Sequence, residues 1–310
     1  MRVIFMGTPD FAAGILEALV EAQTDIVLVV TQPDRVKGRG KSIAMSDVKE
    51  TALKHSLPVF QPERIREAGA VEKIRELKPD IIVVAAFGQI LPKDLLEIPE
   101  HGCINIHASL LPKFRGASPI QQAIIEGEEI TGVTVMQMNE GLDTGDILFQ
   151  EEISISDQET GGSLFERLSA LGAKAAVRAL REAEEGSLKP VPQDEEGASY
   201  AGIIKKEFGR LRFAEDKAVR CERLVRALDP WPSAFTYIGG KMLKLWKSRV
   251  GREGIFGKAG TVTKVSDSEI SVQCADGELV LTEVQLEGKK RMSVHDFLLG
   301  FKVKEGDELG

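Results

Sequence analysis

Three side chains suited to acid–base chemistry lie on two segments in the first half of the chain: Asn105, His107 and Asp143. Asn105 and His107 interrupt an apolar run, and a single isoleucine separates them. Because successive side chains of a strand point to opposite faces, the two share a face if this run is a strand. Buried polar groups need partners, so the pair is either tied into a structural network or directed into a cleft. The spacing alone leaves both interpretations open.

The third residue, Asp143, follows a second strand-like run at 132–138 and lies between Gly141 and Gly145. Glycine permits positive φ angles and close backbone approach, so a carboxylate on such a loop can be held firmly outside any helix or strand. Aspartate is also common in ordinary turns. Opposite an Asn/His pair, however, it would orient the imidazole and stabilise its protonated form. The histidine and asparagine would then face a reacting carbonyl as proton-transfer and oxyanion-binding groups.

A rigid turn, Ser109-Leu-Leu-Pro112, follows the polar pair. Proline restricts its own φ and favours an extended conformation in the residue before it. Ser118-Pro119 then matches an N-cap followed by proline at the first helical position. The pair therefore lies at the end of a strand, beside a turn and a helix N-terminus, which is where open α/β sheets bind their ligands.

The elements that must position these residues alternate between strands and helices. This alternation is typical of βαβ units and predicts an α/β fold with a Rossmann-like, mainly parallel sheet. The predicted strands are residues 2–6, 25–31, 80–86, 102–107 and 132–138, and the predicted helices are residues 11–21, 47–55, 63–77 and 119–126. The first strand–helix turn, Gly7-Thr-Pro-Asp10, lacks the three-glycine dinucleotide fingerprint, which argues against a nicotinamide or flavin site.

The pattern changes after a long helix that we expect to begin with a capping box at Ser163 and to end near Glu185. Residues 186–197 are polar and contain two prolines, as is typical of an interdomain linker. Beyond a predicted helix at 217–228, short strands at hairpin spacing predict a small β-barrel. We therefore predict a catalytic domain over 1–186, a linker over 187–204 and a second domain over 205–310.

Composition places the chain among globular proteins of two-domain size: it has 310 residues, 43% hydrophobic and 28% charged, with a net charge of −8. The longest apolar run, residues 81–87, is too short for a membrane span, so we expect none. A strand-like run begins at residue 2, so we expect no leader peptide. The cysteines Cys103, Cys221 and Cys274 match neither a disulfide framework nor a metal site, which indicates a cytoplasmic setting. We interpret Cys103, on the strand face of the polar pair, as a core residue rather than a nucleophile.

Two segments concentrate positive charge. The loop at 32–41 contains four basic residues and two glycines, and the strand-like run at 241–249 contains four basic residues beside Trp246. Basic groups near an aromatic ring suit contact with a nucleic-acid backbone, although an ordinary solvated surface has the same composition. From residue 206 onward the chain holds 19 Lys and Arg against 16 Asp and Glu, a net of +3 in a chain of net −8. An excess of this size also fits chance.

On these motifs the sequence resembles the 10-formyltetrahydrofolate-dependent formyltransferases. The resemblance covers residues 1–310 and rests on Asn105-x-His107 with Ser109-Leu-Leu-Pro112, and on Gly141-Leu-Asp143-Thr-Gly-Asp146. Further matching segments are Phe5-Met-Gly-Thr-Pro-Asp-Phe11, Thr31-Gln-Pro-Asp34, Gly38-Arg-Gly-Lys41, Ala86-Phe-Gly-Gln89 and Pro230-Trp-Pro-Ser-Ala-Phe235. The loop at 38–41 and the C-terminal third are most similar to the members that act on tRNA.

The resemblance implies an enzyme that passes formyl from 10-formyltetrahydrofolate to the α-amine of methionine on initiator tRNA, for initiation of translation. It implies that the second domain is an OB-like, tRNA-binding barrel, that no metal takes part, and that Asn105, His107 and Asp143 are catalytic. The implied folate-binding residues are Phe87, Gly88, Gln89, Ser109, Leu110, Leu111 and Pro112. The implied tRNA-binding residues are Arg35, Lys37, Arg39, Lys41, Lys244 and Lys247. We further expect a monomer.

Three alternatives differ from this interpretation in features that the sequence contains. A formyltransferase for a nucleotide-linked amino sugar has no need of the basic loop at 38–41. A glycinamide ribonucleotide formyltransferase would end near residue 200 and carry a glycine-rich phosphate loop near its start. A non-catalytic RNA-binding protein would not explain Asn105, His107 and Asp143 together. Asn105, His107 and Asp143 also include no nucleophile, which distinguishes this set of residues from a hydrolase triad.

Overall fold

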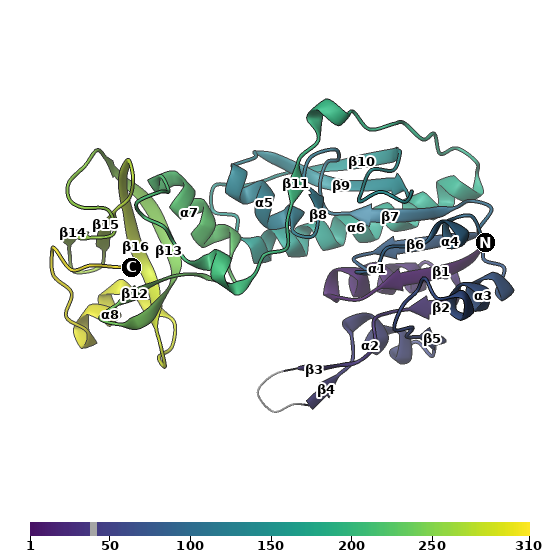
Figure 1. Cartoon of the computed structure of the whole chain (residues 1–310), viewed down its shortest axis with the longest axis horizontal. Helices are drawn as coiled ribbons and strands as arrows, with labels where there is room; N and C mark the ends of the chain where they lie inside the picture. The colour runs from purple at the N-terminus through teal and green to yellow at the C-terminus, as the bar shows by residue number, and fades with distance from the viewer. Residues whose placement is uncertain (38–41) are drawn as a thin grey trace. The chain divides into compact units, whose positions relative to one another are not determined.

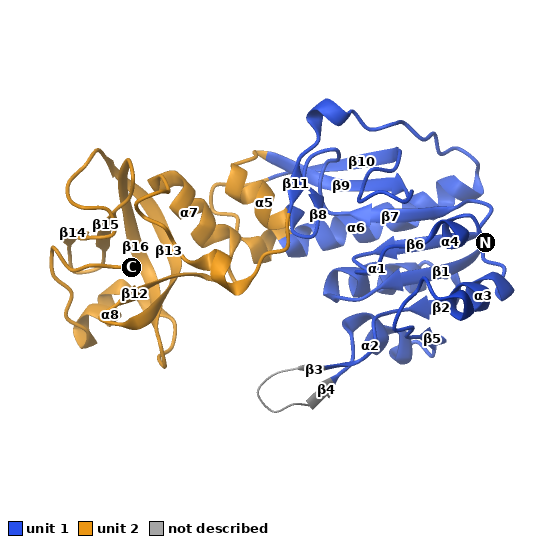
Figure 2. Ribbon diagram, viewed as in Figure 1, with its two compact units in different colours: residues 1–119, 130–154, 165–201 blue, residues 120–129, 155–164, 202–310 orange. Residues whose placement is uncertain are grey.

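The computed structural model describes residues 1–37 and 42–310, and these form two compact units. Unit 1 comprises residues 1–119, 130–154 and 165–201, and unit 2 comprises residues 120–129, 155–164 and 202–310 (Figure 2). Two short segments that precede residue 202 thus pack with the later part of the chain. Within unit 2, for example, the N–H of Gly162 donates to the carbonyl oxygen of Asp229 at 2.8 Å.

The main sheet of unit 1 has seven strands: β1 (Arg2–Gly7), β2 (Asp25–Val30), β5 (Val59–Phe60), β6 (Ile81–Ala85), β7 (Cys103–His107), β9 (Ile130–Gln137) and β10 (Ile147–Ser154). Their order across the sheet is β10-β9-β7-β6-β1-β2-β5 (Figure 1). β1, β2, β5, β6 and β7 are parallel, whereas β9 runs antiparallel to both β7 and β10. The sheet is therefore mainly parallel, which confirms the predicted α/β class.

Every residue of the apolar strands β6 and β7 is buried, as expected for strands covered on both faces. On one face, α3 (Ala68–Glu76) and α4 (Lys93–Leu96) enclose a core cluster that includes Cys103. The other face is covered by α1 (Asp10–Glu21) and α6 (Gly161–Glu184). These helices meet over Ile106, since a Cβ on Gly172 of α6 would lie 3.3 Å from the side chains of both Ile106 and Phe11 of α1. Side-chain alternation therefore places Asn105 and His107 on the face of Cys103.

Two helices begin at different residues from those predicted. α3 begins at Ala68 rather than near residue 63, because Glu67 has an extended backbone (φ −71°, ψ 138°) that interrupts any helix before it. α6 begins at Gly161, ahead of Ser163. The Thr160 hydroxyl accepts from the Ser163 N–H at 3.1 Å and the Ser163 hydroxyl accepts from the Thr160 N–H at 3.0 Å. These reciprocal bonds form a capping box three residues earlier than predicted. The predicted helices at α2 (Asp47–Lys54) and α5 (Pro119–Glu126) are confirmed.

Unit 2 contains an antiparallel sheet of β12 (Ala234–Ile238), β13 (Lys241–Glu253), β14 (Val262–Val265), β15 (Ile270–Gln273), β16 (Gly277–Leu286) and β17 (Met292–Ser293). The hairpin spacing of the short strands corresponds to two hairpins, β12 with β13 and β15 with β16. The hairpin of β12 with β13 has its turn at Gly239 and Gly240, whose φ angles of 55° and 75° suit a two-residue hairpin loop. The helices α7 (Ala218–Ala227) and α8 (Val294–Gly300) and the short turn η2 (Lys206–Gly209) complete the unit's later elements.

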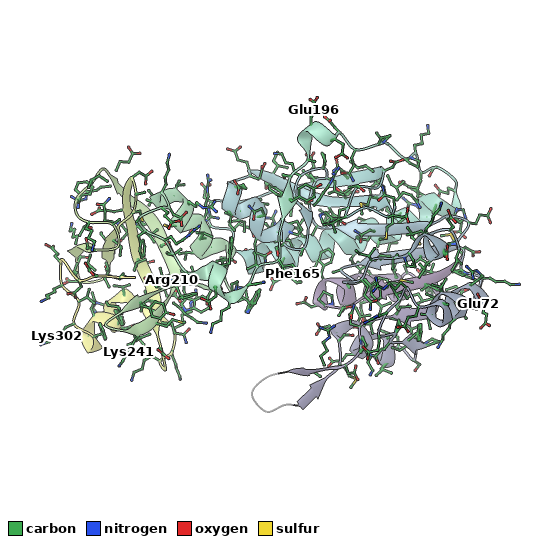
Figure 3. All side chains as sticks on the ribbon, viewed as in Figure 1. Glu72, Phe165, Glu196, Arg210, Lys241 and Lys302 are labelled. Atoms are coloured by element: carbon green, nitrogen blue, oxygen red, sulfur yellow. The ribbon has the colours of Figure 1, made fainter. Side chains whose placement is uncertain are left out.

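Residues 191–201, which we call the return segment, belong to unit 1 and are joined to its earlier strands by backbone pairing. Val191 pairs with Ile147, and β11 (Tyr200–Ala201) pairs in parallel with β8 (Arg115–Gly116). Between them lies the turn η1 (Glu195–Gly197), where Glu196 points away from the unit (Figure 3). A segment whose composition is typical of a linker thus brings side chains to Arg115 of β8 and to the loop that carries Asp143.

Candidate active site

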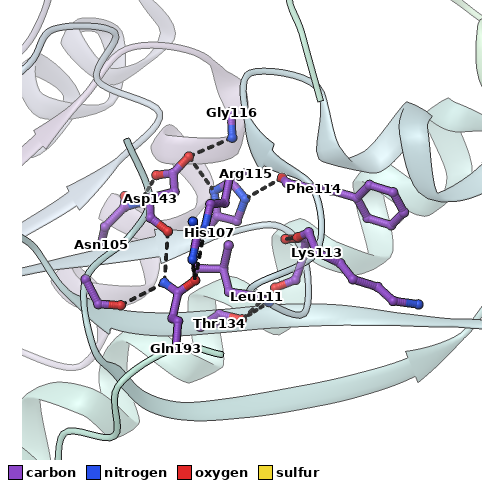
Figure 4. A network of polar contacts seen from close by, with 12 residues as sticks. Asn105, His107, Leu111, Lys113, Phe114, Arg115, Gly116, Thr134, Asp143 and Gln193 are labelled. Carbon is purple, nitrogen blue, oxygen red and sulfur yellow. Dashed lines mark hydrogen bonds and ion pairs between the residues drawn. The ribbon is translucent and has the colours of Figure 1, made fainter. Parts of the chain in front are cut away.

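Asp143 is the centre of a polar network that contains the three residues predicted to act in catalysis (Figure 4). Its Oδ2 accepts from the N–H of Gly116 at 2.8 Å and lies 3.8 Å from Nδ1 of His107, and its Oδ1 lies 3.5 Å from Nδ2 of Asn105. Asn105 and His107 are both buried, with 8% and 7% of their surface exposed. The fold therefore brings Asn105, His107 and Asp143 together.

The loop at residues 138–146 carries Asp143 back over β7. Its end is fixed where the N–H of Gln137 donates to the carbonyl oxygen of Asp146 at 2.8 Å. Gly145 lies so close to this point that a Cβ there would collide with the carbonyl oxygen of Gln137. Asp143 has a φ of 52°, in the left-handed region that aspartate tolerates better than most residues. This backbone conformation is the local reason why the carboxylate faces Asn105 and His107.

The hydrogen bonds of His107 define which nitrogen carries its proton. Nε2 lies 3.1 Å from the carbonyl oxygen of Phe114, which can only accept, so Nε2 donates. The lone pair of the neutral ring is then on Nδ1, which faces Asp143. The distance of 3.8 Å between Nδ1 and Oδ2 is longer than a hydrogen bond, so Nδ1 is not committed to the carboxylate. Protonation at Nδ1 would create an ion pair with Asp143.

The turn after β7 is braced by side chains of β9 and β10. The Ser109 hydroxyl donates to the carbonyl oxygen of Lys113 at 2.7 Å, and the Thr134 hydroxyl donates to that of Ser109 at 2.6 Å. Thr134 also accepts from the N–H of Leu111 at 3.0 Å, and Nε2 of Gln150 donates to the Leu111 carbonyl oxygen at 2.9 Å. Ser109 and Leu111 are buried, so their side chains hold the turn. The side chains left partly exposed are those of Leu110 and Pro112.

The other segment predicted to bind folate, residues 87–89, directs its side chains inward. Phe87 is buried in the core cluster, and its carbonyl oxygen accepts from Nε2 of Gln32 at 3.1 Å. The Gln89 carboxamide is bonded to the N–H of Ile65. Gly88, with a φ of 80°, lies between them. The polar groups of this segment therefore fix the loop that follows β6, and its backbone is what remains for a ligand.

Arg115, Gln193 and Glu195 join the network without having been predicted. Arg115 is 1% exposed, and its guanidinium donates to both carboxylate oxygens of Glu195 at 3.0 and 2.9 Å and to Oε1 of Gln193 at 3.1 and 2.8 Å. The paired guanidinium holds the pKa of Glu195 below its usual range. Because about 80 residues separate Arg115 from these partners, no local spacing in the sequence indicates the contact.

The residues predicted to bind tRNA lie in two places. Arg35 and Lys37 belong to β3 (Arg35–Lys37), which forms a hairpin with β4 (Ser42–Ala44). Arg39 and Lys41 lie outside the described residues. Arg35 is exposed, and its guanidinium lies 3.4 Å from Oε1 of Gln32. The remaining two residues, Lys244 and Lys247, are on β13.

Much of the positive charge on β13 is already paired with acidic side chains of unit 2. Lys247 lies 3.1 Å from Glu283, and Arg249 and Arg252 form ion pairs with Glu269 and Glu278. Lys244 differs, since Nζ lies over the ring of Trp246 at 5.6 Å from its centroid. Lys241 is exposed at the start of the strand (Figure 3). Lys241 and Lys244, rather than the whole strand, therefore carry the charge that is available to an anionic partner.

Among residues 1–37 and 42–310, no group of three or more His, Cys, Asp or Glu side chains is arranged to hold a metal ion. No helix in these ranges combines the length and the apolar content that a membrane span requires. The three cysteines are free and buried. Burial raises the pKa of the Cys103 thiol to about 12, so it stays protonated at neutral pH.

Comparisons with solved structures agree with this architecture. An N-formyltransferase from Helicobacter canadensis, in complex with folinic acid and dTDP-3-aminofucose, superposes with a TM-score of 0.69 at 18% identity, over 94% of this chain and 100% of that one. HypX from Aquifex aeolicus, in complex with tetrahydrofolic acid, superposes with a TM-score of 0.60 at 20% identity, over 99% of this chain and 50% of that one. At such identities the likeness shows a common fold.

Sequence comparisons carry the assignment further. Residues 1–180 match the formyl transferase family, and residues 203–302 match the formyl transferase C-terminal domain. The methionyl-tRNA formyltransferase of Lachnospira eligens is 51% identical over 100% of both chains. That of Geobacter metallireducens is 49% identical over 100% of this chain and 99% of its own. The chain therefore belongs to the formyl transferase family of enzymes and, within it, to the methionyl-tRNA formyltransferases.

Proposed function

We propose that this enzyme transfers the formyl group of 10-formyltetrahydrofolate to the α-amine of methionine carried by initiator tRNA. The observation that carries the proposal is the convergence of Asn105, His107 and Asp143 beside the braced turn after β7. Two hydrogen-bond donors and a carboxylate are what acyl transfer to an amine needs, and the set contains no nucleophile for a covalent enzyme intermediate. Relatives about 50% identical over the full chain support the choice of acceptor.

In the proposed reaction, the uncharged amine nitrogen attacks the formyl carbon and the carbonyl electron pair moves to oxygen. The Asn105 amide and the protonated Nδ1 of His107 donate to the developing oxyanion. Asp143, 3.8 Å from Nδ1, stabilises the imidazolium. The bond between the formyl carbon and N10 of the folate then breaks. The amine loses one proton and N10 gains one, and His107 and Asp143 together relay this proton from the amine to N10.

The turn at Ser109–Pro112 is suited to hold the formyl donor. Thr134 and Gln150 fix its backbone, so it offers a ligand a rigid edge at little entropic cost. We propose that the folate contacts the partly exposed side chains of Leu110 and Pro112 and the backbone at Gly88. The buried Ser109, Leu111 and Phe87, together with Gln89, act by holding these segments in place.

For the tRNA, we propose that Arg35, Lys37, Arg39 and Lys41 bind phosphates near the acceptor end, and that Lys244 and Lys247 add a weaker electrostatic contact. Phosphate contacts of this kind position a nucleic acid without reading its sequence. We also propose that the enzyme is a monomer and that it acts in the cytoplasm, a compartment with which its free, buried cysteines are compatible.

One assay tests the function. Enzyme and 10-formyltetrahydrofolate are incubated with methionyl initiator tRNA, with methionyl elongator tRNA, or with a dTDP-linked amino sugar, and each acceptor is analysed for formyl. We expect formylation of the initiator tRNA alone at an appreciable rate. Formylation of the sugar nucleotide but not of tRNA would overturn the proposal.

A further inference from the structure

Gln193 of the return segment connects the buried Arg115 to the loop that carries Asp143. Nε2 of Gln193 donates to the carbonyl oxygens of Asp143 and Gly145 at 2.8 and 2.7 Å. Its Oε1 accepts from Arg115. A guanidinium only donates and a carbonyl only accepts, so the orientation of this amide is determined by its partners. Both of its N–H groups are therefore directed at the backbone of the Asp143 loop (Figure 4).

The two bonds from Gln193 hold the part of the loop where the backbone is least ordinary. Asp143 has a φ of 52°, a conformation that must be maintained by its surroundings. Gln193 restrains the carbonyl groups on both sides of Thr144, while the N–H of Gly116 restrains the Asp143 carboxylate at 2.8 Å. The backbone and the side chain of one aspartate are thus each held by a separate donor.

The anchor of this arrangement is a buried charge. Arg115 is 1% exposed, and its charge is compensated by Glu195 of the same return segment. Both oxygens of Glu195 are bonded to the guanidinium, a geometry that adds directional specificity to the charge pair. Because a buried charge is costly to leave unpaired, Arg115 holds Gln193 and Glu195 in place. Residues 193–195 and the Asp143 loop therefore form one connected unit.

We propose that Gln193 is a positioning residue for formyl transfer: it holds Asp143 in the conformation that places its carboxylate beside His107, and so contributes to the chemical step without touching either substrate. This inference rests on the proposed function, and it assigns a catalytic contribution to a segment whose sequence is typical of a linker.

The test is Gln193→Glu, which is isosteric and keeps an acceptor for Arg115 but replaces both N–H donors by a carboxylate oxygen facing two carbonyl groups. We expect kcat to fall roughly 10- to 100-fold, the effect of a small displacement of a catalytic group, while each KM changes less than about threefold. The matched control is Glu196→Gln in the same turn. Glu196 is exposed, and we expect the kcat of the Glu196→Gln enzyme to equal that of the wild type. If Gln193→Glu does not fold by circular dichroism, Gln193→Asn replaces it, since it keeps the amide but is one methylene shorter.

A double-mutant cycle with Asp143→Asn separates positioning from a general structural role. If Gln193 acts through Asp143, its substitution costs less than about threefold in kcat when Asp143 is already Asn. Equal fold losses in both backgrounds would overturn the inference, as would a Gln193→Glu enzyme that retains more than half of the wild-type kcat. A wild-type enzyme that formylates no charged tRNA would instead overturn the proposed function, and the inference with it.

Discussion

The charge of Asp143 offers the most direct test of the proposed chemistry. Asp143→Asn preserves the shape of the side chain and an oxygen that can accept from the Gly116 N–H, but it removes the negative charge beside Nδ1 of His107. The loop keeps its anchors, because Gln193 is bonded to backbone groups. The substitution therefore changes the electrostatics of the site more than its structure.

The size of the effect follows from the distance between the two charges. At 3.8 Å, two unit charges attract each other by ~4 kcal/mol at an effective dielectric constant of about 20. The Asp143 side chain is 14% exposed, so solvent screens part of this attraction. If between half and nearly all of it stabilises the imidazolium in the transition state, kcat falls by about 30- to 1,000-fold, since 1.36 kcal/mol corresponds to a factor of ten.

The matched control is Asp146→Asn, three residues further along the same loop. The hydrogen bond that involves Asp146 uses its backbone carbonyl oxygen, which accepts from the Gln137 N–H and is unaffected by the substitution. We expect the kcat of this variant to stay within about threefold of wild type, because the backbone bond that fixes the end of the loop is kept. Single-turnover formylation of charged initiator tRNA, with both substrates saturating, measures the chemical step for each variant. Equal losses for the two variants, or a larger loss for Asp146→Asn, would refute the assignment of Asp143.

Three further outcomes are expected. His107→Ala should lower kcat by roughly 10²- to 10⁴-fold, the range for an acid–base or oxyanion group, with tRNA affinity unchanged, and a variant that keeps more than about a third of wild-type turnover would contradict its role. Pro112→Gly should loosen the turn after β7 and raise the KM for 10-formyltetrahydrofolate, whereas an effect confined to the KM for tRNA would argue against a folate site there. Lys244→Gln should reduce the slope of log tRNA affinity against log salt concentration more than Lys247→Gln does, because Lys247 is already paired with Glu283, and equal slopes for the two variants would show that this pairing is irrelevant to binding.

The alternation of side chains along β7 is a local property, and for that reason the sequence alone predicted that Asn105 and His107 share a face. The alternation of strand-like runs with helical stretches likewise predicted a mainly parallel sheet, because parallel neighbours are joined by a crossover connection that is usually a helix. The glycines around Asp143 indicated a loop that can hold a carboxylate. Each of these conclusions depends on residues within a few positions of one another.

The rest of the network depends on contacts between residues far apart in the chain. Arg115 reaches Gln193 across 78 residues, and Gln193 reaches Asp143 across 50. A polar segment with two prolines is typical of a linker whether or not it folds back, so only tertiary contacts such as the pairing of β11 with β8 reveal that this one packs against the Asp143 loop. The ion pairs on β13 could not be predicted for the same reason, since acidic partners on neighbouring strands do not follow from the spacing of its lysines and arginines. The local pattern of the sequence determined which residues can share a face. The tertiary fold decided which of these side chains have hydrogen-bond or ion-pair partners, and which residues those partners are.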